Sequence, residues 1–383
     1  MLTRLDIRSF KAFGEPGSEI SVTPFMLLVG QNGAGKTSVL QAIELFGLLT
    51  RGNLRQALDQ RLWEYGDLVH LKSETKSMRF VAHVELEGQP IEWVLELGKR
   101  KHLGIAAESV MRDGKVLMWR KGRTMERLDE TSGEMVDQVK QTLPSSWLSA
   151  LEPEDDDRFP TLGRLARWAR GVRPYVVLDP LVLREPSKPH PDGLGIHGEG
   201  LAALLRDLPP KRRAAAVERA QAHYEPLREV RATRSSGSGV TRLDIVESRG
   251  EGTITLGSRQ VSDGLLRLLA LAALHELNDK PSVLLFDEIE NGVHPHLLGA
   301  IVKMLRSLAE TGIQVVASTH SPVAASFVGS AEEVLLVGRT KGGDIDLAPL
   351  SASKKWAKMA KAFAPGEAWY ALGERKLLDG VER

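Results

Sequence analysis

Two kinds of apolar spacing alternate along the chain, and together they predict an α/β protein. Residues 26–29, 282–286 and 313–318 are short, almost continuous apolar runs, which favour buried strands. One helix is predicted over 265–274, an apolar segment for which Ser262 is a suitable N-cap. Another helix is predicted after the run at 26–29, where apolar residues recur at helical spacing: Val39, Leu40, Ile43, Phe46 and Leu49.

Strict alternation of apolar and polar residues marks a different region. Residues 80–86 and 91–97 alternate, and a Glu-Gly-Gln-Pro turn joins them, so we expect an antiparallel hairpin. Residues 110–119 predict one further strand. The segment 134–235 is mostly helical in its spacing, and it lacks sustained heptads, so no long coiled-coil arm is expected.

These patterns divide the chain into four parts. Residues 1–70 and 240–345 are assigned to one discontinuous core. An antiparallel lobe at 71–130 and a helical, basic insertion at 131–239 interrupt this core. Residues 346–383 form a C-terminal tail.

The loop between the first strand and its helix has the sequence of a phosphate-binding loop. Its glycines let backbone N–H groups point at phosphate oxygens, and the helix N-terminus adds a positive dipole. We expect Lys36 to reach the β- and γ-phosphates and the Thr37 hydroxyl to bind Mg²⁺. A chance glycine-rich turn is the alternative, which the flanking strand and helix disfavour. The residues that match are Gly30, Gln31, Asn32, Gly33, Ala34, Gly35, Lys36 and Thr37, followed by Ser38.

Two acids end the second apolar run, and a histidine follows the third. A carboxylate at the C-terminal end of a buried strand can hold Mg²⁺, and a second one can activate the attacking water. We therefore assign Asp287 to the metal and Glu288 to the general base. His320 would face the ligand crevice and bond the γ-phosphate. The alternatives are surface acids that cap a strand and a partly buried polar histidine.

These motifs occur in an order that resembles the ABC-type ATPases, and within them the SMC, RecF and OLD-like group. Residues 5–13 look like the start of that group, and 261–271 resemble its signature loop and helix. Residues 286–295 are similar to its Walker B motif and D-loop, and 318–322 to its switch histidine. The resemblance with specific motifs covers about residues 1–50 and 255–340.

The resemblance implies a fold, a reaction and a partner. The fold is an ABC-ATPase head with a mixed central sheet, an antiparallel β lobe and a helical insertion. The reaction is Mg²⁺-dependent ATP hydrolysis. Two heads would form a homodimer around two ATP molecules, so that Ser262 and Gly264 of one chain contact the γ-phosphate held by Lys36 of the other. Asp263 belongs to the same signature loop and is assigned with them.

Several positions depart from the pattern of the transporter ATPases. His294 stands where those proteins usually carry the D-loop Asp, and Ile289 stands where Pro is usual. Gln56 and Gln60 are both candidates for the Q-loop residue, and the sequence does not choose between them.

Composition limits the remaining function classes. Hydrophobic residues make up 42% of the chain and charged residues 26%, and there is no cysteine, which excludes disulfides and thiolate zinc sites. No apolar run approaches the roughly 18 residues that a membrane helix needs. Charged residues also interrupt the N-terminal segment, which argues against a secretory signal. We expect a cytoplasmic protein without a membrane partner.

Basic segments are the best indication of a partner. The net charge is +1, so affinity for nucleic acid must come from local patches. Lys and Arg are concentrated at 99–123, 164–173 and 211–234, and such clusters can neutralise the phosphates of double-stranded DNA. Solvated charged faces are the alternative. Four tail lysines beside Trp356 and Phe363 predict a surface helix or a partner contact: Lys354, Lys355, Lys358 and Lys361.

The expected function is therefore a DNA-associated ATPase, a clamp or sensor in genome maintenance or phage defence. One alternative is the nucleotide-binding subunit of an ABC transporter, against which the arginine-rich insertion argues. Another is the ATPase regulatory subunit of a separate nuclease or toxin effector, since the 63 residues after His320 are too few for an appended nuclease. A third is a module that holds ATP with little turnover.

Overall fold

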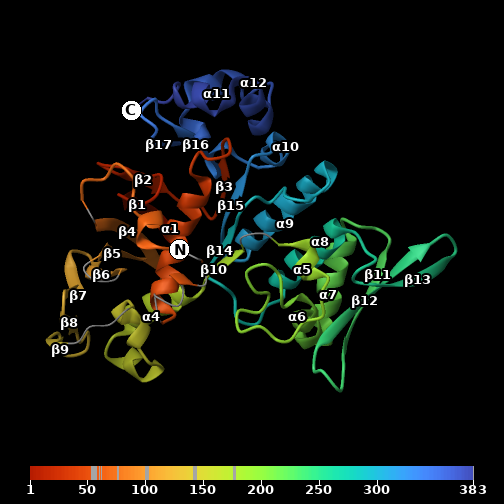
Figure 1. The fold of residues 1–383 in the computed structure, drawn as a ribbon, viewed down its shortest axis with the longest axis horizontal. Coiled ribbons are helices and arrows are strands. Elements are labelled where there is room, and N and C mark those ends of the chain that lie inside the picture. The colour runs from red at the N-terminus through yellow and green to blue at the C-terminus, as the bar shows by residue number, and fades with distance from the viewer. Residues whose placement is uncertain are drawn as a thin grey trace.

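The central sheet contains the three strands that the apolar runs predict. In the computed structural model, which describes residues 1–52, 58–59, 61, 63–75, 77–99, 103–140, 145–175 and 178–382, six strands follow the order β10-β14-β15-β3-β16-β17 (Figure 1). Neighbouring strands are parallel except β16 and β17. The bounds are β3 Phe25–Val29, β10 Val172–Tyr175, β14 Val283–Phe286, β15 Gln314–Thr319, β16 Val334–Arg339 and β17 Ile345–Pro349.

Both faces of the central sheet are buried. Met26 and Leu28 join one apolar cluster, whereas Phe25, Leu27 and Val29 join the other, because successive side chains of a strand point to opposite faces. A strand buried on both faces is apolar throughout, which explains the continuous runs. The first cluster contains α1 (Lys36–Thr50), and the second contains α8 (Asp263–His275) and α9 (Leu298–Glu310).

The second sheet is antiparallel and has eight strands. Its order is β2-β1-β4-β5-β6-β7-β8-β9, and α1 packs between it and the central sheet within one apolar cluster (Figure 1). The bounds are β1 Leu2–Arg8, β2 Ser18–Ser21, β4 Ser77–Leu86, β5 Gln89–Lys99, β6 Leu103–Arg112, β7 Lys115–Lys121, β8 Thr124–Leu128 and β9 Met135–Lys140.

The predicted hairpin is confirmed, and the further strand is corrected. Strands β4 and β5 pair with Glu85 opposite Pro90. The single strand predicted at 110–119 is wrong, because Asp113 and Gly114 have φ of +50° and +76° and reverse the chain. Strands β6 and β7 therefore form a second hairpin. The sheet also takes in β1 and β2 from the N-terminal segment.

The segment predicted as mostly helical is mixed. Strand β10 joins the central sheet beside β14, and β11 opens a small sheet of order β11-β12-β13. The longest helix in the described part of this segment, α7, has 12 residues, so a long coiled-coil arm is absent there. The bounds are α4 Pro160–Arg170, α5 Pro180–Leu183, α6 Leu201–Asp207, α7 Pro210–Gln221, β11 Leu227–Arg234, β12 Thr241–Arg249 and β13 Gly252–Gly257.

Four further α-helices complete the described part of the chain. The tail lysines begin on a helix, α11, as the sequence predicts, and Phe363 beyond it is 44% exposed. None of the helices in the described residues is long and apolar enough to cross a membrane. The remaining bounds are α3 Tyr65–Leu68, α10 Pro322–Ala325, α11 Lys354–Met359 and α12 Pro365–Leu378.

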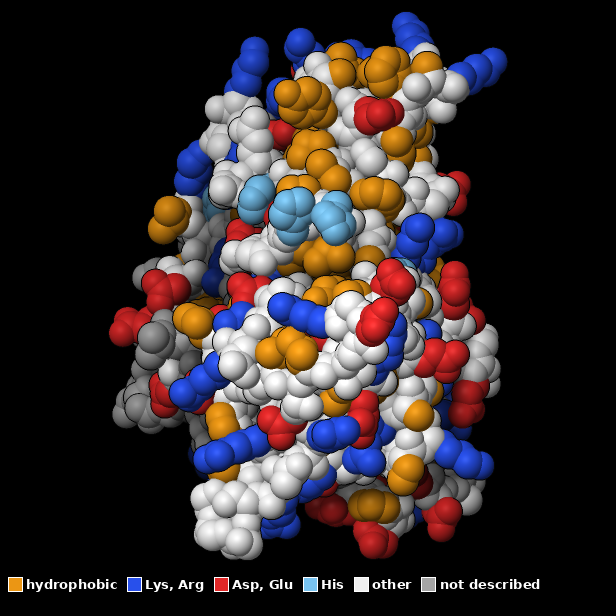
Figure 2. All heavy atoms as spheres, turned by 90° about the vertical axis from the view of Figure 1, so that its right-hand side faces the viewer, with side chains coloured by type: hydrophobic (Ala, Val, Ile, Leu, Met, Phe, Trp, Pro, Cys, Tyr) orange, Lys and Arg blue, Asp and Glu red, His pale blue; other side chains and the backbone are white. Residues whose placement is uncertain are grey.

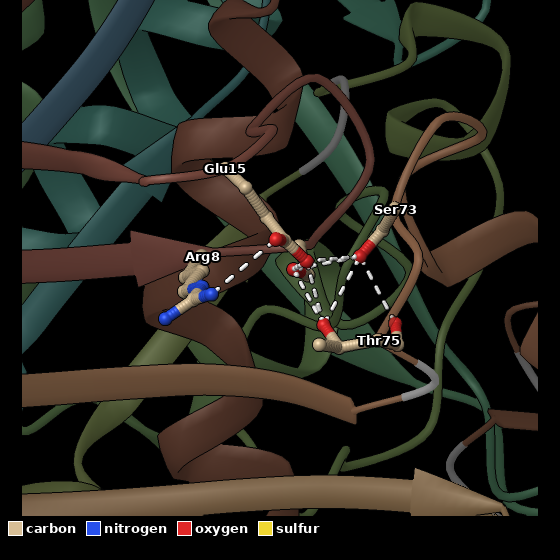
Figure 3. A network of polar contacts seen from close by, with 5 residues as sticks. Arg8, Glu15, Ser73 and Thr75 are labelled. Atoms are coloured by element: carbon tan, nitrogen blue, oxygen red, sulfur yellow. Dashed lines mark hydrogen bonds and ion pairs between the residues drawn. The ribbon is translucent and has the colours of Figure 1, made fainter.

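A cluster around Glu15 ties the N-terminal strand to the segment before β4 (Figure 3). One carboxylate oxygen accepts hydrogen bonds from Thr75 Oγ1 at 2.7 Å, Ser73 Oγ at 2.8 Å and Ser9 Oγ at 3.2 Å. The other lies 3.3 Å from Arg8. These hydrogen bonds, that from Thr75 first, lower the pKa of Glu15 to about 2.

The Glu15 cluster predicts a pH-dependent contribution to stability. A carboxyl whose pKa falls on folding stabilises the native state above its unfolded pKa, and this contribution disappears as the pH falls through the folded value. Glu15→Gln should therefore lower the urea midpoint at pH 7, and the difference from the wild type should shrink between about pH 4.5 and pH 2. Urea unfolding across that range measures it. A difference that does not change with pH would contradict an ionic contribution.

Candidate nucleotide-binding and hydrolysis site

Three parallel strands end at the same edge of the central sheet. Val29 of β3 lies opposite Thr319 of β15, and Phe286 of β14 lies opposite Ala317 of β15. The residues that follow these strands therefore emerge together. Ligands of open α/β sheets bind at this carboxyl edge, which makes it the candidate site.

The glycine loop is shaped by close contacts and by left-handed backbone. A Cβ on Gly30 would lie 2.0 Å from the Val337 carbonyl oxygen, and Gly33 has φ of +75°. Gly35, at +117°, precedes the first helical residue, Lys36. The Arg339 guanidinium donates two hydrogen bonds to the Gly33 carbonyl, at 2.8 and 3.0 Å. The loop is therefore fixed in a conformation that side chains with a Cβ rarely adopt.

Lys36 is buried at the mouth of this loop. Its Nζ donates to the carbonyls of Gly30 at 2.7 Å and Gln31 at 3.0 Å. Burial lowers the pKa of Lys36, while the negative charges of Glu290 and Asp287 oppose that shift. The Lys36 ammonium is therefore close to the acids that follow β14.

Thr37 and Asp287 meet across the site. The Thr37 hydroxyl donates to Asp287 Oδ2 at 2.8 Å, and Ser318 Oγ donates to Asp287 Oδ1. Mg²⁺ prefers one or two protein oxygens and completes its shell with phosphate and water. A hydroxyl and a carboxylate at hydrogen-bond distance fit that ion. The described residues contain no group of three or more metal-binding side chains.

Glu288 has an unusual backbone next to Asp287. Its φ is +48°, a left-handed conformation that costs energy for a residue with a Cβ. The Ser318 hydroxyl accepts from the Glu288 N–H at 2.9 Å, and the Ser318 carbonyl accepts from Ile289 N at 3.1 Å. Ser318 thus holds both acids of the pair.

Glu290 holds His320, the predicted switch histidine, in place. One carboxylate oxygen lies 2.7 Å from His320 Nδ1 and also accepts from the His320 backbone N–H at 2.5 Å. The other oxygen accepts from Thr319 Oγ1 at 2.7 Å. A carboxylate on Nδ1 selects the tautomer with a proton there. His320 Nε2 is thereby left available for a ligand.

The signature residues lie at the N-terminus of α8. Ser262 Oγ caps the helix by accepting from Leu265 N at 3.4 Å, and Asp263 pairs with Arg184. A Cβ on Gly264 would lie 2.5 Å from Leu297, which places this glycine against the segment after the D-loop. In the described residues, no hydrogen bond or ion pair joins the signature residues to the glycine loop.

The D-loop contains two histidines in contact. The Nδ1 atoms of His294 and His296 are 3.0 Å apart, and their rings meet edge to face. Histidine side chains gather among apolar ones on the face shown in Figure 2. The two Q-loop candidates, Gln56 and Gln60, lie outside the described residues.

Three residues of this site were not predicted from the sequence. Ser318 lies inside the motif at 318–322 and Glu290 inside that at 286–295. Nothing in the sequence distinguishes a serine or an acid that hydrogen-bonds another motif residue from one that does not. Arg339 follows an apolar run at 334–338, which marks it as a residue at the carboxyl edge of a strand. The position of Arg339 directly after this run was the sequence signal that could have identified it.

Comparisons with known proteins point to ATPases. Residues 201–326 match the family described as "AAA domain, putative AbiEii toxin, Type IV TA system". The chain is 33% identical over 144 residues to the DNA replication and repair protein RecF of Citrobacter koseri, covering 37% of this chain and 31% of that protein. It is also 33% identical over 105 residues to the UvrABC system protein A of Chlamydia pneumoniae, 27% of this chain and 6% of that protein.

The fold is that of SMC head domains. The Smc head domain derived from Pyrococcus furiosus, bound to the C-terminal domain of ScpA, superposes with a TM-score of 0.56 at 13% identity, covering 94% of this chain and 98% of that chain. Together, the matched relatives and the fold support an ABC-type ATPase of the SMC and RecF group. The alignments with the curated relatives span about a third of RecF and a small part of the UvrABC protein.

Glu290 provides a test of how the histidine is positioned. If it acts through His320, Glu290→Ala should lower the rate of ATP hydrolysis by roughly 10- to 100-fold, the usual effect of a lost outer-shell partner. Nucleotide binding should change little. Glu290→Gln, which keeps one acceptor oxygen, should recover part of the rate. Glu332→Ala, an exposed acid, is the control.

A double variant distinguishes positioning from an independent role. Residues that act as a unit have non-additive effects. Glu290→Ala combined with His320→Ala should therefore hydrolyse ATP no more slowly than His320→Ala alone. Additive losses in steady-state ATPase assays would contradict the positioning role.

Proposed function

We propose that the protein is an ATP hydrolase that uses Mg²⁺ and dimerises head to head around two ATP molecules. The observation that carries the proposal is the contact of Thr37 with Asp287 at 2.8 Å, beside the buried Lys36. The site around this contact combines a phosphate-binding loop, a pair of oxygens suited to a metal ion and an adjacent acid, Glu288. Hydrolysis of a nucleoside triphosphate is the reaction that uses all three.

Each residue has a separate task in this mechanism. Lys36 and the backbone N–H groups of the loop would bind the β- and γ-phosphates. Thr37 and Asp287 would hold Mg²⁺, which would supply positive charge to neutralise the charge that develops on the phosphate. Glu288 accepts the proton of the attacking water. As an imidazolium, His320 would donate from Nε2 to the γ-phosphate while its Nδ1 donates to Glu290. The strained backbone of Glu288 keeps its carboxylate at the strand end.

The signature loop supports a dimeric state. Ser262 is exposed, and no polar contact joins it to the glycine loop of its own chain within the described residues. A signature that completes a site in the partner chain accounts for both facts. In this arrangement ATP holds two heads together and its hydrolysis separates them.

The proposed role is that of a clamp or sensor on double-stranded DNA, in genome maintenance or phage defence. One matched relative is a DNA replication and repair protein. The basic segments support this role less strongly than their composition suggests. Arg112 pairs with Glu130, Arg167 with Asp156 and Arg219 with Glu276, so much of their charge is already compensated.

An effector protein is the second candidate partner. The matched family carries a toxin system in its description, which favours an ATPase that regulates a toxin or nuclease. Such a partner does not change the proposed chemistry. The transporter alternative has no comparable support among these relatives.

Nucleotide-driven dimerisation predicts a trapped state. Glu288→Gln should keep ATP binding but lower turnover by roughly 10²- to 10⁴-fold, the usual effect of losing a general base. The protein should then remain dimeric in ATP and Mg²⁺. Size-exclusion chromatography with light scattering measures this, and a monomeric Glu288→Gln protein in saturating ATP would contradict the sandwich.

Two control variants separate binding from pairing. Lys36→Ala should lose ATP binding, because the phosphate charge loses its cation. Ser262→Arg should bind ATP nearly as well as the wild type but neither dimerise nor hydrolyse it. If both variants lose binding equally, Ser262 acts within its own chain.

DNA association predicts a steep dependence on salt. If about five phosphates are neutralised, log affinity should fall against log salt with a slope near −4 to −5. Replacing Lys211, Arg234 and Arg242 by Glu should weaken binding. All three are exposed, and none forms an ion pair with a described residue.

The matched control is the same charge reversal on α11, at Lys354, Lys355 and Lys358. It should leave DNA binding almost unchanged, and neither triple variant should alter ATP binding. Gel shifts with a duplex at low salt and with ATP provide the measurement. Absence of any complex at micromolar protein would exclude the DNA role and leave a protein partner.

A further inference from the structure

A hollow lies away from the nucleotide site, between α7 and the edge strand β11. It is a groove of about 560 Å³, on the small three-stranded sheet to the right in Figure 1. Six successive residues of β11, 228–233, line it. Because side chains alternate between the faces of a strand, six successive residues can line one groove only where it follows the edge of the strand.

The register identifies which backbone groups face this groove. Ser235 N donates to Val240 O at 2.9 Å, so Ser235 and Val240 form a hydrogen-bonded pair. Such pairs alternate along an antiparallel ladder, and the register continues without a shift to Val230 opposite Ile245. The N–H and C=O groups of Val230 and Ala232 therefore point away from β12.

These outward groups have no backbone partner. Strand β11 pairs only with β12, and no backbone hydrogen bond beyond that ladder involves residues 228–233 within the described part of the chain. An open edge of this kind is a template for one more strand. The six residues offer a length of roughly 20 Å at 3.3–3.4 Å per residue.

The side chains around the groove carry more positive than negative charge. The lining contains Arg213, Arg228, Arg231, Glu218 and Glu229. Arg231 pairs with Glu229 at 2.8 Å. Among the described residues, Arg228 donates only to the carbonyls of Glu225 and Leu227, and Arg213 donates to that of Arg206. Two guanidinium groups in the groove are thus free to pair with carboxylates of a ligand.

We propose that this groove binds an extended, acidic segment of a partner protein, which adds as a fourth strand beside β11. A peptide strand offers alternating N–H and C=O groups. It can therefore donate to the outward C=O groups of β11 and accept from its outward N–H groups. A phosphate backbone is only an acceptor and would leave the Val230 and Ala232 carbonyls unpaired. Peptide recognition therefore accounts for the edge and the charge together, whereas DNA accounts for the charge alone.

The position of the groove connects it with the ATPase. Helix α7 packs on α8, where Arg212 and Arg219 contact Glu276 at the end of the signature helix. Strand β13 ends at Gly257, five residues before Ser262. A partner docked here would contact α7, the helix that packs on the C-terminal end of α8, although the proposal does not depend on ATP hydrolysis.

Fluorescence anisotropy with a labelled Val-Glu-Val-Glu-Val-Glu-Val peptide tests the proposal on the full chain. The acidic peptide should bind at least about tenfold more tightly than its Lys counterpart, a difference of about 1.4 kcal/mol. Arg228→Glu should weaken binding of the acidic peptide and improve that of the Lys peptide. Equal affinity for the two peptides, or no binding of the acidic one, would overturn the proposal.

A proline variant tests the strand edge directly. Ala232→Pro removes an outward N–H without removing a ladder bond to β12, so it should weaken binding at least about tenfold. Thr255→Pro is the matched control. Ser258 N donates to Leu243 O, and by the same alternation Thr255 N–H points away from β12, at the opposite edge of the sheet. Equal loss in both variants would overturn an edge-specific site.

Hydrogen exchange on the unaltered protein provides a readout that needs no variant. Binding of the acidic peptide should protect the amides of Val230 and Ala232, which have no acceptor in the ladder. Protection elsewhere but not in 228–234 would overturn strand addition. Displacement of the peptide by a short DNA duplex, with the same residues protected by the duplex, would identify the groove as a nucleic-acid surface instead.

Discussion

The parallel pairing of β14, β15 and β3, buried on both faces, is the constraint on which the functional site depends. Two apolar clusters hold these strands from opposite sides, so a one-residue slip in register would move every side chain into the opposite cluster and disrupt the packing of both. This register places the C-terminal ends of the three strands at the same edge of the sheet. The residues that follow the strands are therefore close together. The Thr37 contact with Asp287 joins residues 250 positions apart as a consequence of that pairing.

The polar network at the sheet edge adds what packing alone cannot specify. Ser318 bonds Asp287 and the Glu288 N–H, and Glu290 bonds both His320 and Thr319. The carboxylates of Asp287 and Glu290 thus both have donors. Satisfied buried networks hold one geometry because an unpaired member is costly. The same network places negative charge around Lys36, which opposes the effect of burial on its pKa.

Sequence reasoning succeeded where one physical signal decides a structure. The runs at 26–29, 282–286 and 313–318 predicted strands because burial on two faces demands apolar residues throughout. It failed at β10, a four-residue strand whose sequence, Val-Arg-Pro-Tyr, has no strand period, and at 110–119, where a turn with positive φ divides the run. Glu290 and Arg339 could not be assigned roles, because their partners are set by tertiary contacts and not by spacing. The domain boundaries and the roles of the site residues stay predictions.

The basic insertion shows why composition is a weak guide to a partner. Counted along the sequence, its arginines resemble a phosphate-binding surface. In the fold, many of them pair with acids or with backbone carbonyls, and Arg212 and Arg219 fasten α7 to the end of the signature helix. Charge that is used inside the molecule is not available to neutralise DNA. The insertion retains unpaired backbone groups at the edge of β11 and a small excess of positive charge beside them. These two features together specify a narrower class of ligand than either feature alone.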